Sequence, residues 1–298
     1  MDQREGERAG TSVEPGARDR RAERAAARRA RSLRGQGIAA ASTIIVLGGL
    51  ALVVLTSPGW TVFRESFFSA EVFADSFPDI LRAFWLDVRV FMVVEVAVLI
   101  LGLTVALVRT VRLPALFPLK ILAIVFTDVF RGIPTILLVY LVGFGVPAIT
   151  QEQAADGSQP LAWLPTEPVI LGGFALALSY SAYVAEVYRA GINSIHRGQR
   201  DAALAVGLTE RQALRHVIVP QAVRRIGPPL LNDFIALQKD VALIAIIGVT
   251  GEAFRTAQIQ ASADFNYTPL VAAALLYLCI TIPMARVLDR YGLGGQTR

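Results

Sequence analysis

The sequence has little cysteine, histidine and lysine. Its 298 residues include one cysteine, two histidines and two lysines. A single cysteine, Cys279, excludes a disulfide within the chain and argues against a cysteine-based metal site. It lies in an apolar run, where a small hydrophobic role suffices. His196 and His216 fall in one polar segment without metal-ligand spacing, so no metal site is predicted.

The scarcity of lysine excludes one nucleotide-binding motif. A phosphate-binding P-loop requires lysine followed by serine or threonine. Here Lys120 precedes Ile121, and Lys239 precedes Asp240. No nucleophile–base pair or metal-ligand set indicates an enzyme either. We therefore expect no cofactor in this chain, and if ATP drives the protein, a partner chain binds and hydrolyses it.

Charge is scarce as well. Charged residues make up 18% of the chain against about a quarter in soluble domains, the hydrophobic fraction is 54%, and the mean hydropathy is +0.52. Stretches of about 20 apolar residues are long enough to cross a bilayer core. The sequence predicts an all-α polytopic membrane protein with about six spans. These are residues 38–56, 88–108, 116–146, 168–187, 228–248 and 269–287.

The N-terminal segment differs from the rest. Residues 1–36 contain ten arginines and six acidic residues, and no apolar face, which predicts a disordered basic cytoplasmic tail over 1–37. The interspersed acids argue against nucleic-acid binding and favour either orientation of the first helix or attraction to anionic lipid. Because the basic region is too long for a signal peptide, residues 38–56 are predicted to be a retained N-terminal span.

The basic residues predict an orientation. With the N-terminus inside, the inside segments carry 23 of the 29 lysines and arginines, and the outside segments carry four. An excess of basic residues marks cytoplasmic loops. The distribution predicts that both termini and the loop 188–227 are cytoplasmic, in a multi-pass protein of a bacterial cell membrane.

The loop 188–227 carries local helix signals. Residues 199–206 include three alanines and predict a helix, and Gly207 fits the left-handed position that ends one. Thr209 and Gln212 have the spacing of a capping box for a second helix, which Pro220 is predicted to end. Apolar residues for packing are Leu204, Val206, Leu208, Leu214 and Val217.

Two interpretations of this helix–turn–helix compete. It could bind DNA, but spans end about ten residues on either side and hold it against the membrane. The favoured interpretation is a docking element for a cytoplasmic protein, in which small residues allow close approach. Four flanking arginines suit an acidic groove on that partner; they are Arg197, Arg200, Arg211 and Arg215.

The loop resembles a known family motif. Asp201-Ala202-Ala203, Gly207 and Val217-Ile218-Val219-Pro220 resemble the EAA loop of ABC importer permeases, with Asp201 in place of the usual glutamate. The resemblance implies that residues 197–220 form the coupling loop, with Asp201, Ala202, Ala203, Gly207 and Pro220 as its anchors. It also implies docking on cytoplasmic ATP-binding subunits.

Further segments resemble the polar amino acid branch of this family. Phe130-Arg131-Gly132-Ile133-Pro134, residues 181–192 and Leu237-Gln238-Lys239-Asp240 match its segments. The likeness covers about residues 86–290, which implies a permease domain with the type I importer transmembrane fold. Members commonly have five spans, so 38–56 is an extra helix. The resemblance also implies a second permease subunit, identical or related, and an extracytoplasmic substrate-binding protein.

Charged residues inside spans are costly and often functional. The candidates are Asp128, Arg131, Glu186, Asp233, Lys239 and Asp240. For a zwitterionic amino acid, Arg131 and Lys239 would meet the carboxylate, and Glu186 and Asp240 the ammonium group. The alternative is three structural pairs near the interfaces. These would be Lys239–Asp240, Arg131–Asp128 and Glu186–Arg189.

The residues leave one rival function open. A self-contained secondary transporter or channel would have the same spans but would need neither a docking loop nor ATP. Membrane lipid surrounds the protein in either case. The sequence does not distinguish which amino acid would be carried.

Overall fold

The computed structural model describes residues 15–110, 113–155 and 163–292, and side chains within 35–110, 113–151 and 163–290. Every regular element in these ranges is a helix, which confirms the all-α fold class. The chain divides into two units, Met1–Arg64 and Glu65–Arg298.

The first unit is dominated by one helix. Helix α1 spans Pro15–Leu55, and α2, Gly59–Phe67, begins in this unit. The tail that was expected to be disordered over 1–37 is therefore helical from Pro15 onward, because its alanine- and arginine-rich composition consists of strong helix formers. Residues 1–14 lie outside the described ranges.

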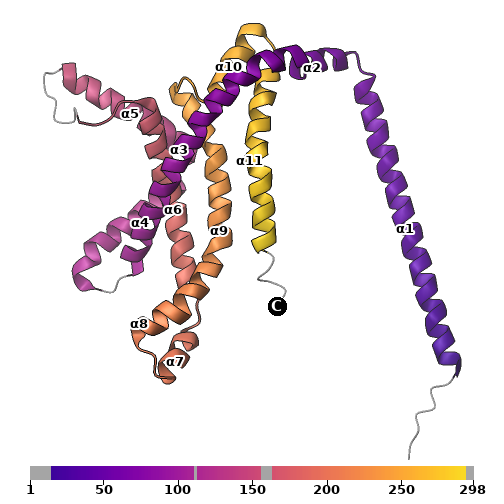
Figure 1. Ribbon diagram of the computed structural model, residues 1–298, viewed down its shortest axis with the longest axis horizontal. Helices are drawn as coiled ribbons and strands as arrows, with labels where there is room; N and C mark the ends of the chain where they lie inside the picture. Colours follow the sequence, from indigo (N-terminus) through magenta and orange to yellow (C-terminus); the bar gives the residue numbers. More distant parts are fainter. Residues whose placement is uncertain (1–14, 111–112, 156–162, 293–298) are drawn as a thin grey trace, which may run out of the picture. The chain divides into compact units, whose positions relative to one another are not determined.

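The second unit contains the remaining helices (Figure 1). These are α3 (Ala70–Thr110), α4 (Phe117–Gly132), α5 (Thr135–Ala155), α6 (Pro168–Asn193), α7 (Arg197–Ala205), α8 (Glu210–Ala213), α9 (Val219–Asp240), α10 (Ala253–Asp264) and α11 (Thr268–Gly292). Two 3-10 segments, Pro114–Leu116 and Val241–Ile247, and a π-helical segment, Leu214–Ile218, complete the described elements.

Four described helices are long and apolar enough to cross a membrane. They are Gly35–Leu55, Gly59–Thr110, Pro168–Asn193 and Thr268–Arg290. The count becomes five if Pro114–Gly132 and Thr135–Gln151, which meet at 106°, form one broken span. This pair is the span expected over 116–146, and it breaks at Pro134. Of the six expected spans, 228–248 is the one not counted, because α9 is amphipathic and carries charge at Asp233.

Helix α6 forms the centre of the second unit. In Figure 1, α3 crosses it diagonally, and α4, α5 and α9 also pack on it. The close packing depends on small residues. A Cβ atom at Gly102 of α3 would lie 2.7 Å from Val184 Cγ1, and one at Gly191 would lie 2.1 Å from Ile226 Cγ1. Glycine at these positions lets α3 and α9 approach α6 closely.

The expected end of the loop's second helix at Pro220 is wrong. Helix α8 passes through the π-helical segment Leu214–Ile218 directly into α9, and Pro220 stands in the first turn of α9. Proline lacks an N–H group and its ring clashes with the carbonyl four residues earlier. A widened π turn just before the proline accommodates both features, so the helical backbone continues.

Candidate functional site

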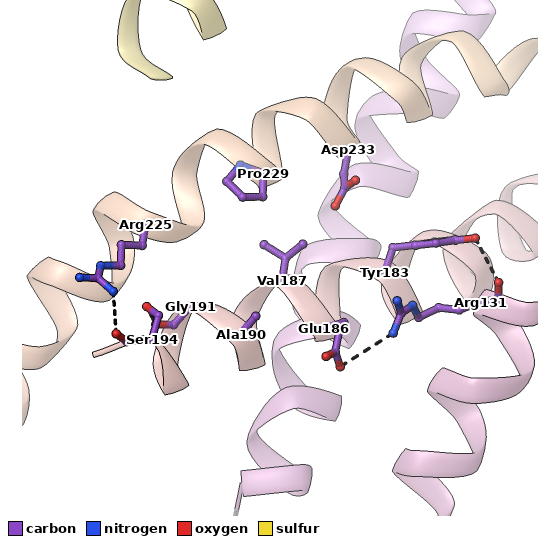
Figure 2. A pocket seen from close by; sticks show the side chains of 10 residues that line it. All are labelled: Arg131, Tyr183, Glu186, Val187, Ala190, Gly191, Ser194, Arg225, Pro229 and Asp233. Atoms are coloured by element: carbon purple, nitrogen blue, oxygen red, sulfur yellow. Dashed lines mark hydrogen bonds and ion pairs between the residues drawn. The ribbon is translucent and has the colours of Figure 1, made fainter. Parts of the chain in front are cut away.

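A cavity of 400 Å³ opens between α4, α6 and α9, with charged side chains on its walls (Figure 2). Helix α4 contributes Arg131 from its last turn. Helix α6 contributes Tyr183, Glu186 and small residues, and α9 contributes Arg225 and Asp233. The cavity wall therefore carries two positive and two negative side chains.

Glu186 sits at the centre of an arginine cluster. Its Oε2 accepts hydrogen bonds from Arg109 Nη1 and Arg189 Nε, each at 3.0 Å, and its Oε1 accepts one from Arg189 Nη2. Arg131 Nη1 lies 4.0 Å from Oε2. Arg109 also donates to Thr127 Oγ1 at 3.0 Å. Three helices thus bring three guanidinium groups to one carboxylate.

Arg131 is held from two further sides. Its guanidinium lies over the ring of Tyr183, with Cζ 5.7 Å from the ring centroid, in the range of a cation–π contact. The hydroxyl of Tyr183 donates to the Arg131 carbonyl at 3.2 Å. That carbonyl lies just before the break at Pro134, where the helix leaves backbone groups unpaired. The side chain of Arg131 remains 41% exposed, so it can donate hydrogen bonds into the cavity.

On the wall formed by α9, Asp233 extends toward α6 near Val187 (Figure 2). Its Oδ2 atom is buried and accepts no hydrogen bond within the described part of the chain. A buried acceptor without a donor costs free energy, so this atom is suited to meeting a donor that enters the cavity. Arg225, two turns earlier, donates from Nη1 to the Ser194 carbonyl at 2.6 Å.

The structure places the predicted binding residues in two groups. Arg131 and Glu186 come together on the cavity wall, whereas Lys239 and Asp240 do not line it. Asp240 instead accepts a hydrogen bond from the Tyr180 hydroxyl at 2.8 Å. Of the three structural pairs considered as alternatives, only Glu186–Arg189 is present among the ion pairs of the described residues. The five described ion pairs are Arg82–Asp79, Arg109–Glu186, Arg131–Glu186, Arg189–Glu186 and Arg200–Glu210.

The predicted loop signals are present below the cavity. Gly207 has φ +89° and ends α7. The Gln212 backbone N–H donates to Thr209 Oγ1, and the Thr209 N–H donates to Gln212 Oε1, which completes the capping box. Arg200 donates two hydrogen bonds to Glu210 across the turn, at 2.9 and 2.6 Å. These bonds lower the pKa of Glu210 below its usual value.

The loop exposes apolar side chains. Val206 is 78% exposed and Leu214 is 54% exposed, whereas Ala203 is buried at 5%. Asp201 and Pro220 are exposed. Exposed apolar side chains beside a rigid, capped turn are typical of a protein contact surface. Of the expected anchors, Ala203 therefore supports the internal packing of the loop rather than its outer surface.

The loop is connected to the wall formed by α9. Gln221 Nε2 of α9 donates to Gln199 Oε1 of α7 at 3.2 Å. Beneath them, Ile195, Ala222 and Ile226 form a buried cluster. The helix that carries Asp233 into the cavity therefore also holds the loop.

An acidic cluster lies at the other end of the unit, and the sequence pattern did not predict it. Asp87 and Glu252 are buried, at 2% and 0% exposure. The Tyr277 hydroxyl donates to Asp87 Oδ2 at 2.8 Å and lies 3.3 Å from Glu252 Oε1. Glu252 also caps α10 by accepting from the N–H groups of Phe254 and Arg255. The sequence signal for this cluster is Asp87, an acidic residue within an apolar run.

The arrangement defines a class of protein. Apolar spans, a charged cavity between helices and a structured loop connected to the cavity wall are the features expected of a membrane permease. Comparisons with known proteins agree. Residues 99–291 match the family model "Binding-protein-dependent transport system inner membrane component".

Individual proteins are also similar to this chain. The chain is 32% identical over 206 residues to "Arginine transport system permease protein ArtQ" of Bacillus subtilis (strain 168), covering 69% of this chain and 87% of the relative. It is 34% identical over 215 residues to "Probable amino-acid permease protein YxeN" of the same organism, covering 71% and 89%. A solved structure, "Crystal structure of an amino acid ABC transporter with histidines", matches with TM-score 0.60 and 29% identity, covering 72% of this chain and 92% of that one.

The chain belongs to the family of inner membrane components of binding-protein-dependent transport systems. It is a multi-pass membrane protein and the permease subunit of an ATP-driven importer.

Proposed function

We propose that this permease carries a polar amino acid, and that the cavity between α4, α6 and α9 receives it. The names of the relatives support an amino acid substrate. The wall chemistry supports a zwitterion, because cationic and anionic side chains face one space. Arg131 would bind the carboxylate in the bidentate manner typical of guanidinium groups, and Asp233 would accept from the ammonium group. Glu186 would orient Arg131.

The 197–220 loop would dock on a separate ATP-binding subunit. Val206 and Leu214 would enter its surface groove, with the surrounding arginines facing acidic residues at the rim. This chain would then neither bind a cofactor nor hydrolyse ATP. Two copies of the permease, or one copy with a related subunit, would enclose the pathway, and a binding protein would deliver substrate to the outer face. The basic-residue distribution supports cytoplasmic termini.

One observation carries this proposal: α9 supplies Asp233 to the cavity and also holds the loop through Gln221. A change in the position of the loop would therefore be transmitted to the cavity wall. Such transmission is what an importer requires when nucleotide-driven closure of one subunit must open or close a site in another.

The test uses the complete transporter in lipid vesicles with its ATP-binding subunit and binding protein. Uptake of labelled amino acids and ATP hydrolysis are measured for wild type, Val206→Glu and Val206→Thr. Because Val206 is exposed, neither change should disturb the fold. Val206→Glu should uncouple or release the ATPase, and the uncharged Val206→Thr, of similar size, should retain most activity.

A second variant tests the cavity. Asp233→Asn keeps the shape of the side chain but removes its charge, and should reduce uptake about tenfold while ATPase docking persists. Uptake that continues without ATP or the ATPase subunit would contradict the proposal and favour a self-contained secondary transporter. Full coupling in Val206→Glu would contradict the assignment of the docking surface.

A further inference from the structure

A second cavity, with no lining residue in common with the charged one, lies between α3 and α6. Its volume is 450 Å³. Eleven residues of α3 and α6 line it: Leu86, Arg89, Val90, Val93, Val94, Ala97, Val169, Ile170, Gly173, Phe174 and Ala177. Among its lining residues, Arg89 is the single charged one. Nothing in the proposed transport cycle uses this groove.

Small residues create the groove. A Cβ atom at Gly173 would lie 3.3 Å from Val94 Cγ2, so α3 and α6 approach closely at this level. Ala97 and Ala177 are too short to fill the space outside this contact. Larger side chains form the rim, with Val93 71% exposed and Phe174 54% exposed. The result is a concave apolar surface with open sides.

The dimensions of the groove match one leaflet of a bilayer. Ala97 lies eleven positions after Leu86, which corresponds to about 16 Å along a helix. That is about half of the ~30 Å thickness of the hydrocarbon core. The groove begins near Pro168, at the start of α6, and the 197–220 loop, here called the docking loop, follows the end of the same helix. It therefore lies in the leaflet remote from the loop.

Arg89 stands at the outer end of this groove. Its side chain is exposed and makes no ion pair with any residue that the structure describes. From Val90 onward the exposed residues of α3 are apolar as far as Thr104, so Arg89 marks the boundary of the hydrocarbon region. An arginine at this depth directs its guanidinium to the interface, where the phosphate of a lipid lies.

We propose that this groove is a binding site for a phospholipid with a net negative headgroup. The acyl chain would lie along Val93, Ala97 and Gly173, and the headgroup phosphate would accept hydrogen bonds from Arg89. A guanidinium matches a phosphate in charge and in bidentate geometry. The lipid would cover this apolar surface. Its phosphate would also pair with Arg89, which has no anionic partner among the described residues.

The experiment uses the full chain, purified in detergent and examined by native mass spectrometry with phosphatidylglycerol, phosphatidylcholine or inorganic phosphate added. Wild type should retain phosphatidylglycerol in preference to phosphatidylcholine, which has the same chains but no net charge. Inorganic phosphate should not compete. Arg89→Gln should reduce retention of phosphatidylglycerol about fivefold, and Arg89→Lys should retain most of it.

Two further variants complete the test. Ala97→Phe fills the groove and should reduce retention of both lipids, with thermal unfolding as the check of folding. Arg82→Gln is the matched control, since Arg82 lies on the same helix, is exposed and already pairs with Asp79 at 3.0 Å; it should change nothing. Equal retention by wild type and Arg89→Gln would overturn the site. The site would also be overturned if Ala97→Phe dissociated a dimer without changing lipid retention, because a second copy of the chain would then occupy the groove.

Discussion

Two clusters of ionisable side chains at opposite ends of the second unit are stabilised in different ways. Near the docking loop, one carboxylate, Glu186, faces three arginines. At the far end, Asp87 and Glu252 lie together, and no described ion pair reaches either of them. The first cluster has an excess of positive charge and the second has an excess of acid.

The difference follows from exposure. Glu186 borders a cavity, and its side chain is 25% exposed, so the surplus arginine charge can be hydrated. Asp87 and Glu252 have no such access, and burying two charged carboxylates side by side is costly. Their cluster relies on a tyrosine hydroxyl, the N-terminal amides of α10 and the helix dipole. Hydrogen bonds from neutral donors to both carboxyl groups offset part of that cost.

The largest effect is expected from Glu252→Ala. The change removes both acceptors that cap α10 and leaves buried N–H groups without partners. We expect a loss of about 2–4 kcal/mol in the free energy of unfolding, measured by thermal unfolding in detergent. Glu252→Gln keeps an acceptor and a neutral side chain and should cost much less. An equal cost for the two variants would contradict the capping role of Glu252.

The next largest effect should come from Glu186→Gln. Without the carboxylate charge, Arg109, Arg131 and Arg189 repel one another around a neutral amide. We expect a loss of about 1–3 kcal/mol in the free energy of unfolding, measured by thermal unfolding in detergent. Glu186→Asp is the matched control, because it keeps the charge and shortens the side chain. A gain in stability for Glu186→Gln would show that the arginines are adequately hydrated without the carboxylate of Glu186.

A smaller effect concerns pH. Burial raises the pKa of Glu252 above its ordinary value of 4.5. A raised folded-state pKa gives stability that is present below pH 4.5 and lost as pH rises through the raised value. Wild type should therefore lose stability as pH rises above 4.5, measured as a falling unfolding temperature. Glu252→Gln should show a flatter profile over that range; identical slopes would refute this assignment.

The smallest effect is expected at the exposed pair Arg200–Glu210. Surface ion pairs contribute little to stability, so Arg200→Gln should leave the unfolding temperature unchanged. The same variant in the complete transporter should weaken ATPase stimulation, because Arg200 lies on the proposed docking surface. A large drop in unfolding temperature would mean that the turn depends on this pair for its fold.

Local features could be predicted from the sequence. Gly207 and the Thr209–Gln212 capping box involve residues within a few positions, and backbone chemistry determines them. The effect of Pro220 could not be predicted in the same way. Whether a proline ends a helix or follows a π turn depends on packing against α7 and α6, which sequence spacing does not reveal.

Long-range partners were harder still. The proximity of Arg131 and Lys239 to acidic neighbours in sequence favoured Asp128 and Asp240 as partners, but Arg131 pairs with Glu186 from another helix. Asp87 and Glu252 come from distant segments, and only the fold brings them together. Charge within a span indicates a site without indicating which element completes it.

The π-helical segment has a mechanical consequence. Because α8 continues through Leu214–Ile218 into α9 without a break, the chain from Glu210 to Asp240 is one lever. Its short arm is α8, Glu210–Ala213, and its long arm is α9, which carries Asp233. The wide turn between them is the point where the lever can flex. A displacement of the short arm would move a charged side chain about four helical turns beyond this point, because no flexible loop lies between them.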